Sequence, residues 1–228
     1  MTRIKFSDRK KAWNKKAQKS KRPLEALRKR KRYLIVCEGE KTEPYYFRGL
    51  EKARLPENVV IVAQGFGKST LSLVKHAIDL HHKLEKIGEG ADEVWLVFDK
   101  DDFKDDAFDN AITKCEAQKF KTQDNIEKSF QCAWSNESFE LWYLLHFKDV
   151  TAWTSRKALN ADLSKQLGYK YSKADEKFYS ILQEKGNEAA AIDRAEKLLQ
   201  QAVPPWHNAN PATKVHELVQ VLLTHEIL

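Results

Sequence analysis

The amino-acid sequence predicts an α/β fold, with a parallel sheet flanked by helices, a helical C-terminal extension and a basic N-terminal arm. From residue 31 to about 150, short apolar blocks alternate with blocks of helical periodicity, which is typical of a parallel sheet with crossover helices. Beyond this point only helical periodicity continues. We therefore expect an arm at 1–30, an α/β core at 31–150 and a helical extension at 151–228.

The individual blocks can be assigned in chain order. Apolar and β-branched residues predict strands at 32–37, 58–63, 94–98 and 127–134. Helices are expected at 42–53, 69–87, 105–120 and after 135, and in the extension at 155–167, 172–184, 187–202 and 212–226. Thr42 is a candidate cap of the first helix, with Pro44 in its first turn, and Ser135 or Asn136 of the fourth. No pattern in the sequence indicates a site partner for His81 or His82, and both are expected on a helix surface.

Basic residues are concentrated at the start of the chain. Residues 1–33 contain 15 Lys and Arg but only Asp8 and Glu25, a net charge of +13. The remaining 195 residues carry 25 basic and 31 acidic groups, a net of −6. Such an arm is typical of contact with nucleic-acid phosphates, although a solvated charged tail has the same composition. The expected contact residues are Lys10, Lys11, Lys15, Lys16, Arg28, Arg30 and Arg32.

The composition argues against several classes of protein. An apolar fraction of 42% is enough for a core. No run of about 18 apolar residues is present, and the first residues lack the apolar stretch of a secretory signal. Cys37, Cys115 and Cys132 are odd in number and far apart, which argues against a disulfide framework or a zinc site. We expect a cytoplasmic protein without membrane contact; its oligomeric state stays open.

Two of the expected strands end in carboxylates. Glu38 and Glu40 follow the first strand, and Asp99 and Asp101 follow the third. Ligands of parallel sheets bind at the carboxyl ends of the strands. Clustered carboxylates need a counter-charge, and Mg²⁺ and Mn²⁺ prefer oxygen ligands. We therefore expect Glu38, Asp99 and Asp101 to hold such a metal, with Glu38 or Glu40 handling a proton.

Simpler roles stay open for neighbouring residues. For Glu43 and Asp102 the alternative to a site role is that each carboxylate only stabilises the N-terminus of a helix. The segment GFGKST at 65–70 is similar to a phosphate-binding loop, but Val62 stands where such a loop needs glycine. Lys68 is still a candidate phosphate contact at a helix N-terminus, and a plain turn before a helix is the alternative.

The two carboxylate motifs resemble a known signature. The segment LIVCEGEKTE, followed about 60 residues later by VWLVFDKDDF, resembles the Toprim domain of topoisomerases, primases and OLD-family nucleases. That domain has Glu-Gly after its first strand and Asp-x-Asp after its third. By this resemblance Glu38 takes the place of the general acid/base and metal-site glutamate, and Asp99 and Asp101 take the places of the metal-binding aspartates.

A finer resemblance is to the RloB-like family, a Toprim-related family found beside restriction–modification genes and implicated in phage defence. The segments CEGEKTEPYYF, SNESFELWYLLHF and NPATKVHELV carry it, within residues 33 to about 222. The second segment departs from the family pattern S-N-P-x-F-E because Glu137 replaces proline. The resemblance marks Asn136, Glu140 and His146 as candidates that line the site. We expect His146 to orient a water or to donate to a phosphate.

The resemblance implies a Mg²⁺- or Mn²⁺-dependent nuclease that hydrolyses phosphodiester bonds in RNA, with tRNA as one candidate, or in DNA. It also implies a role in antiphage defence, often with an ATPase subunit encoded nearby. Two alternatives stay open: a non-catalytic nucleic-acid-binding or regulatory subunit with a vestigial site, and a nucleotidyl transferase. The retained carboxylates argue against the first, and the lack of a primase-specific segment argues against the second.

Overall fold

The computed structural model describes residues 30–57, 59–65, 70–100 and 105–225. The chain divides into Met1–Arg30 and a compact unit, Lys31–Leu228, and the fold below is that of the second unit. Several expected site residues therefore lie outside the described residues: Lys10, Lys11, Lys15, Lys16, Arg28, Lys68, Asp101 and Asp102.

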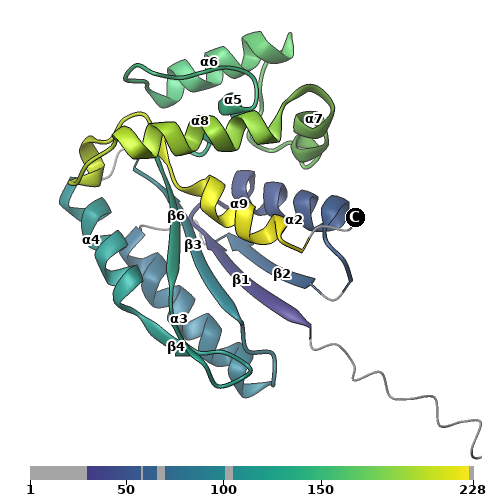
Figure 1. The fold of residues 1–228 in the computed structure, drawn as a ribbon, viewed down its shortest axis with the longest axis vertical. Helices are drawn as coiled ribbons and strands as arrows, with labels where there is room; N and C mark the ends of the chain where they lie inside the picture. Colours follow the sequence, from purple (N-terminus) through teal and green to yellow (C-terminus); the bar gives the residue numbers. More distant parts are fainter. Residues whose placement is uncertain (1–29, 58, 66–69, 101–104, 226–228) are drawn as a thin grey trace, which may run out of the picture. The chain divides into compact units, whose positions relative to one another are not determined.

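A five-stranded sheet with the order β2-β1-β3-β6-β7 forms the centre of this unit (Figure 1). Its strands are β1 (Lys31–Cys37), β2 (Val59–Gly65), β3 (Glu93–Asp99), β6 (Gln131–Asn136) and β7 (Ala212–Thr213). The pairs β1–β2, β1–β3 and β3–β6 are parallel, and β7 pairs with β6 in the antiparallel direction. The expected α/β fold with a mostly parallel sheet is confirmed.

Eight α-helices surround the sheet in the part of the chain that the structure describes. They are α2 (Thr42–Arg54), α3 (Thr70–Lys86), α4 (Asp105–Ala117), α5 (Glu140–Leu145), α6 (Arg156–Leu167), α7 (Phe178–Lys185), α8 (Glu188–Gln201) and α9 (Val215–Leu223). Helices α3 and α4 cover one face of the sheet, and α2 and α9 cover the other (Figure 1). Helices α5 to α8 lie toward the carboxyl ends of the parallel strands.

The side chains of β1 alternate between two hydrophobic clusters. Tyr33, Ile35 and Cys37 belong to the cluster that α2 covers, and Leu34 and Val36 belong to the one that α3 and α4 cover. All five are at most 1% exposed. A strand with both faces buried needs apolar residues at every position, which explains the unbroken apolar run in the sequence.

The C-terminal segment shares the core of the sheet. The cluster on the α2 side continues through Leu159 of α6 and Ala195 of α8 to Leu218 of α9. β7 adds a strand to the sheet itself. The residues after 150 therefore pack as a continuation of the α/β core.

Several local expectations were wrong. The expected strand at 127–134 is two strands, because β5 (Glu127–Ser129) turns back to form a hairpin with β4 (Lys119–Lys121) before β6 begins. His81 is buried at 1% exposure because its ring packs on Phe120 and Phe130 of this hairpin region. The helix expected from 105 to 120 ends at Ala117, because β4 of this hairpin begins at Lys119.

The expected helix caps also differ. Ser135 and Asn136 are the last residues of β6, and α5 begins at Glu140 without a side-chain cap. Thr42 is the first residue of α2 and makes no capping bond. The last helix starts at Val215 because the two preceding residues of β7 pair with β6. The helix expected at 172–184 starts only at Phe178.

Candidate active site

The candidate site lies where the order of the strands reverses. From β1 the chain crosses to β2 on one side, and then returns past β1 to β3 on its other side. In open parallel sheets, ligands bind in the crevice at such a switch point, beyond the carboxyl ends of the two strands. Glu38 directly follows β1, and Asp99 is the last residue of β3. The two strongest candidates from the sequence therefore meet at this edge of the sheet.

Hydrogen bonds tie Glu38 to β3. Its backbone amide donates to the carbonyl oxygen of Val97 at 2.8 Å. Its carboxylate Oε2 accepts from the backbone amide of Asp99 at 3.3 Å. The side chain of Glu38 therefore bridges the ends of the two strands.

Glu43 lies in the first turn of α2 and is only 4% exposed. Its carboxylate Oε1 accepts a hydrogen bond from the backbone amide of Gly39 at 3.2 Å. A Cβ atom on Gly39 would lie 2.3 Å from Oε2 of Glu43, which no real contact allows. The glycine between Glu38 and Glu40 therefore allows the Glu43 carboxylate to approach this closely, and a larger residue there would displace it.

Glu140 is the first residue of α5 and is 1% exposed. Its Oε1 accepts from the hydroxyl of Tyr171 at 3.3 Å and pairs with Nζ of Lys173 at 3.2 Å. Its Oε2 is buried and, within the described residues, has no hydrogen-bond partner. Oδ1 of Asp99 is also buried and has no hydrogen-bond partner within the described residues, although Asp99 as a whole is partly exposed. Buried oxygens without partners are rare, and each calls for a specific explanation.

The four carboxylates Glu38, Glu43, Asp99 and Glu140, which we call the carboxylate cluster, act on one another electrostatically. Burial raises the pKa of Asp99 well above its usual value, and the charges of Glu43, Glu140 and Glu38 raise it further. Burial also raises the pKa of Glu43 to about 7, with a further contribution from Glu140 and an opposing one from Lys173. The cluster therefore holds its negative charge at a cost in free energy.

The residue types of the cluster are those that bind hard divalent cations. Mg²⁺ and Mn²⁺ take carboxylate oxygens as ligands, and Asp99 and Glu140 of the cluster each have one buried oxygen without a partner in the described residues. The cluster is not a closed ligand shell, however. Within the described ranges, the one group of three such residues with ligand atoms within 4.8 Å of one another is His81, His82 and Glu85. Asp101, the third expected ligand, lies outside these ranges.

Other expected site residues lie elsewhere. Glu40 is exposed in the turn between β1 and α2. The carboxamide of Asn136 donates to the carbonyl oxygens of Trp206 and His207, at 3.2 and 2.9 Å, and so holds the loop after α8. Arg32 lies near the start of β1, at the opposite end of the strand from Glu38, and its guanidinium donates to the carbonyl of Gly88 at 3.1 Å.

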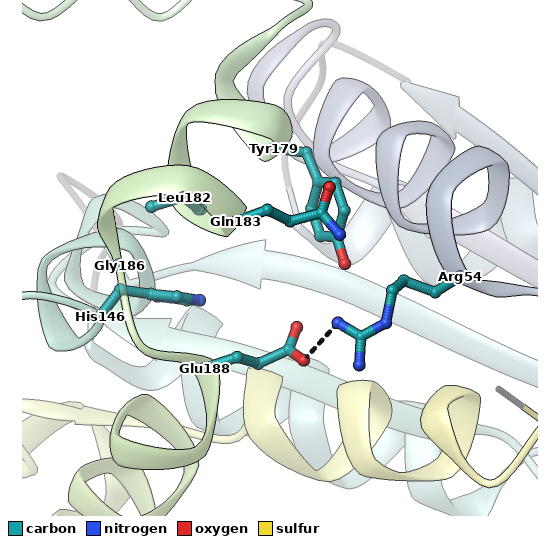
Figure 2. Close-up of a pocket in the computed structure, with 7 residues that line it drawn as sticks. All are labelled: Arg54, His146, Tyr179, Leu182, Gln183, Gly186 and Glu188. Atoms are coloured by element: carbon teal, nitrogen blue, oxygen red, sulfur yellow. Dashed lines mark hydrogen bonds and ion pairs between the residues drawn. The ribbon is translucent and has the colours of Figure 1, made fainter. Parts of the chain in front are cut away.

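The structure does not bring His146 together with the carboxylate cluster. It caps the C-terminal end of α5, and its Nδ1 donates to the carbonyl oxygen of Trp142 at 2.9 Å. Its ring lines a separate pocket (Figure 2). Burial lowers the pKa of His146 to about 4, and the charge that lowers it further is that of Arg194. A catalytic role for His146 stays a prediction without support from its position.

Two residues of the site were missed from the sequence. Tyr171 and Lys173 belong to the segment between α6 and α7, and both contact Glu140. The backbone of this segment is also bound to the start of α2, because Thr42 Oγ1 donates to the carbonyl of Lys173 at 3.2 Å. The bond between Thr42 and Lys173 joins positions 131 residues apart, and no local pattern in the sequence indicates any of these contacts.

Comparison with known proteins identifies the family. A family model described as RloB-like protein matches residues 33–222. The chain belongs to the RloB-like family. Neither the search of curated proteins nor that of solved structures gave a significant match. In this RloB-like chain the matched range runs from β1 into α9, and so contains the whole carboxylate cluster.

None of the helices in the described residues is long and apolar enough to cross a membrane. The Asn136–Glu137 peptide bond is cis, at the position where the family pattern has proline.

Proposed function

We propose that this RloB-like chain is a Mg²⁺- or Mn²⁺-dependent nuclease of the Toprim class. Its substrate would be RNA, with tRNA as one candidate, or DNA, and its role antiphage defence. The observation that carries the proposal is the carboxylate cluster at the switch point, with two buried oxygens that lack partners among the described residues. Buried carboxylates with raised pKa values in a crevice are typical of functional sites.

Glu38 and Asp99 are the described residues that we expect to hold the metal, with Asp101 as a further ligand. A metal bound there would polarise the phosphodiester and lower the pKa of an attacking water. Glu43, with a pKa of about 7, has the acidity of an efficient general acid or base near neutral pH. Lys173 brings a positive charge to the same place through its ion pair with Glu140.

The basic arm is the proposed contact for the nucleic-acid backbone. Its lysines and arginines would supply affinity without sequence preference. Selection of a particular RNA or DNA then depends on the body of the protein or on a partner, for which an ATPase subunit encoded nearby is the candidate.

The decisive experiment compares wild type with Asp99→Ala and with the control Glu184→Ala, which changes an exposed residue of α7. Each protein is incubated with tRNA, mRNA, single-stranded DNA and double-stranded DNA in Mg²⁺, Mn²⁺ or EDTA, with and without the candidate ATPase. We expect wild type and Glu184→Ala to cut one substrate class in metal only, and Asp99→Ala to cut none.

Other results would favour other functions. Absence of cleavage in every arm, with nucleic-acid binding unchanged by Asp99→Ala, would indicate a binding subunit with a vestigial site. Incorporation of labelled nucleoside triphosphates would indicate nucleotidyl transfer instead of hydrolysis.

A further inference from the structure

A pocket separate from the carboxylate cluster lies between α2, α7 and the start of α8. Its volume is about 160 Å³, and its lining residues are Arg54, His146, Tyr179, Leu182, Gln183, Gly186 and Glu188. Figure 2 shows the imidazole of His146 projecting into it from one side, with Tyr179 and Gln183 along another. The proposed hydrolysis uses none of these residues.

The hydrogen bond at Nδ1 fixes the chemistry of His146. A carbonyl oxygen can only accept, so Nδ1, bonded to the carbonyl of Trp142 at 2.9 Å, carries the proton. Because burial keeps the pKa of His146 at about 4, the ring is neutral near pH 7. Nε2 is then a hydrogen-bond acceptor on a side chain that is only 4% exposed. The pocket therefore presents a buried acceptor to whatever enters it.

The walls of the pocket are held in place. A Cβ atom on Gly186 would lie 2.9 Å from Cβ of His146 and 2.8 Å from the carbonyl oxygen of Leu182, so the turn between α7 and α8 packs directly on the histidine. The next amide, that of Asn187, donates to the carbonyl of His146 at 3.0 Å. On the other side the ion pair of Arg54 and Glu188, at 3.0 Å, joins α2 to α8.

The size and polarity of the pocket restrict its ligand. A cavity of about 150 Å³ accommodates one benzene ring, so this pocket has room for a single six-membered ring. The acceptor Nε2 needs an N–H or O–H donor from the ligand. The amide of Gln183 offers a donor for a carbonyl oxygen, and the ring of Tyr179 offers an aromatic surface. A cyclic imide, with N–H beside C=O, combines these properties, and in nucleic acids uracil and thymine have this edge.

We propose that this pocket binds the imide edge of a uracil-type pyrimidine. Its N–H donates to Nε2 of His146, and its carbonyl accepts from the amide of Gln183. The proposal rests on the proposed function only for the source of the base, which is a nucleotide of the nucleic-acid substrate. A free nucleoside presents the same edge, and the test below separates the two sources.

The test is a binding titration of the full chain in EDTA, where the proposed cleavage cannot occur. Uridine, 3-methyluridine and a uridine-only RNA oligonucleotide are added while the side-chain nitrogen resonances of ¹⁵N-labelled histidines are recorded. We expect uridine to shift the Nε2 resonance of His146. 3-Methyluridine lacks the donor, and its affinity should be lower by about tenfold, the effect of leaving one buried acceptor unpaired.

Protein variants provide the second arm. Gln183→Ala changes an exposed side chain and should weaken uridine binding by about fivefold, the typical effect of one hydrogen bond. Glu184→Ala, one position along α7, should bind as wild type does. If wild type binds the oligonucleotide but not uridine, and Gln183→Ala weakens the oligonucleotide, the base comes from the substrate. If wild type binds both and Gln183→Ala weakens both, the pocket also accepts the free nucleoside.

Two results would overturn the proposal: equal affinity for uridine and 3-methyluridine, or no shift of the His146 resonance with uridine or oligonucleotide at millimolar concentration. Neither depends on catalysis. Asp99→Ala should bind uridine as wild type does. If the wild-type chain binds uridine but cuts no nucleic acid, the proposed nuclease function is contradicted and the proposed uracil pocket is not.

Discussion

The backbone amide of Asp99 donates to Oε2 of Glu38 at 3.3 Å. The side chain that follows β1 is thereby fixed to the backbone that ends β3, at the point where the strand order reverses. Glu38 is oriented by a bond to an uncharged amide, while Asp99 faces other carboxylates and keeps one oxygen without a partner within the described residues. The arrangement brings several carboxylates together, and their mutual repulsion and burial raise the pKa of Asp99.

The first prediction concerns Glu43 and pH. Its pKa is about 7 in the folded protein and about 4.5 when unfolded, so the folded state binds the proton more tightly. In EDTA, this residue's contribution to stability is complete below pH 4.5 and is lost as pH rises through 7, by up to about 3 kcal/mol. Urea unfolding of wild type and Glu43→Gln across this range should show a steeper decline for wild type. Parallel curves would contradict the pKa assigned to Glu43.

The second prediction separates stability from activity at Asp99. Asp99→Asn removes a carboxyl group whose charged form is disfavoured by burial and by three neighbouring carboxylates, so the metal-free protein should gain stability at pH 8, by up to about 2 kcal/mol. The same change should abolish cleavage and the stabilisation of the protein by Mg²⁺. Urea unfolding in EDTA and in Mg²⁺ measures both effects, with the exposed Glu184→Gln as control. A loss of stability in EDTA would mean that the charge at Asp99 is satisfied without metal.

The position of Glu38 and Asp99 could be predicted because it depends on local signals. Two apolar runs, each followed at once by carboxylates, define two parallel strands, and parallel strands place their carboxyl ends at one edge. Which strands are neighbours was not needed for this inference. The structure adds that β1 and β3 are adjacent, and this adjacency allows the amide of Asp99 to reach the Glu38 carboxylate.

The position of His146 could not be predicted in the same way. It occupies one helix face with Trp142, and the sequence places that helix directly after a strand of the sheet. α5, however, is only six residues long, with Glu140 as its first residue and His146 as its C-terminal cap. The two side chains therefore lie at opposite ends of the helix, and Glu140 joins the cluster whereas His146 faces α7 and α8. The role of Lys173 could not be predicted because it lies in the segment between α6 and α7, 33 residues after its partner Glu140 in α5. Contacts of this kind arise from tertiary packing, which sequence periodicity does not describe.

The third prediction tests the close approach at Gly39. Gly39→Ala would place Cβ against the carboxylate of Glu43, so Glu43 must leave the bond that it accepts from this amide. We expect a loss of about 1–3 kcal/mol in stability and weaker Mg²⁺ binding. Gly90→Ala is the matched control, since its Cβ meets only an ordinary contact at 3.5 Å. Combining Gly39→Ala with Glu43→Ala should restore part of the stability; a double variant no more stable than Gly39→Ala would place the clash elsewhere.

The fourth prediction concerns the basic arm. Deleting residues 1–29 removes five of the expected phosphate contacts: Lys10, Lys11, Lys15, Lys16 and Arg28. The logarithm of the binding constant for double-stranded DNA should then depend less on the logarithm of salt concentration, with a slope smaller by about 4. Fluorescence anisotropy between low and moderate salt measures this slope. An unchanged slope would show that the arm makes no contact with the backbone phosphates.

The fifth prediction uses His146, whose pH dependence has the opposite sign to that of Glu43. Its pKa is about 4 in the folded protein and about 6.5 when unfolded, so the unfolded state binds more protons between these values. The contribution of His146 to the free energy of unfolding is complete above pH 6.5 and falls by up to about 3 kcal/mol as pH drops toward 4. His146→Gln removes the titrating group, so the difference in unfolding free energy between wild type and variant should shrink steadily from pH 7 to pH 4.5.

Other buried histidines, such as His81 and His216, also have lowered pKa values, but they contribute equally to both proteins and cancel in the difference. A difference that does not change with pH would mean that His146 has the same pKa in the folded and unfolded states, and would contradict the lowered pKa assigned to the buried ring.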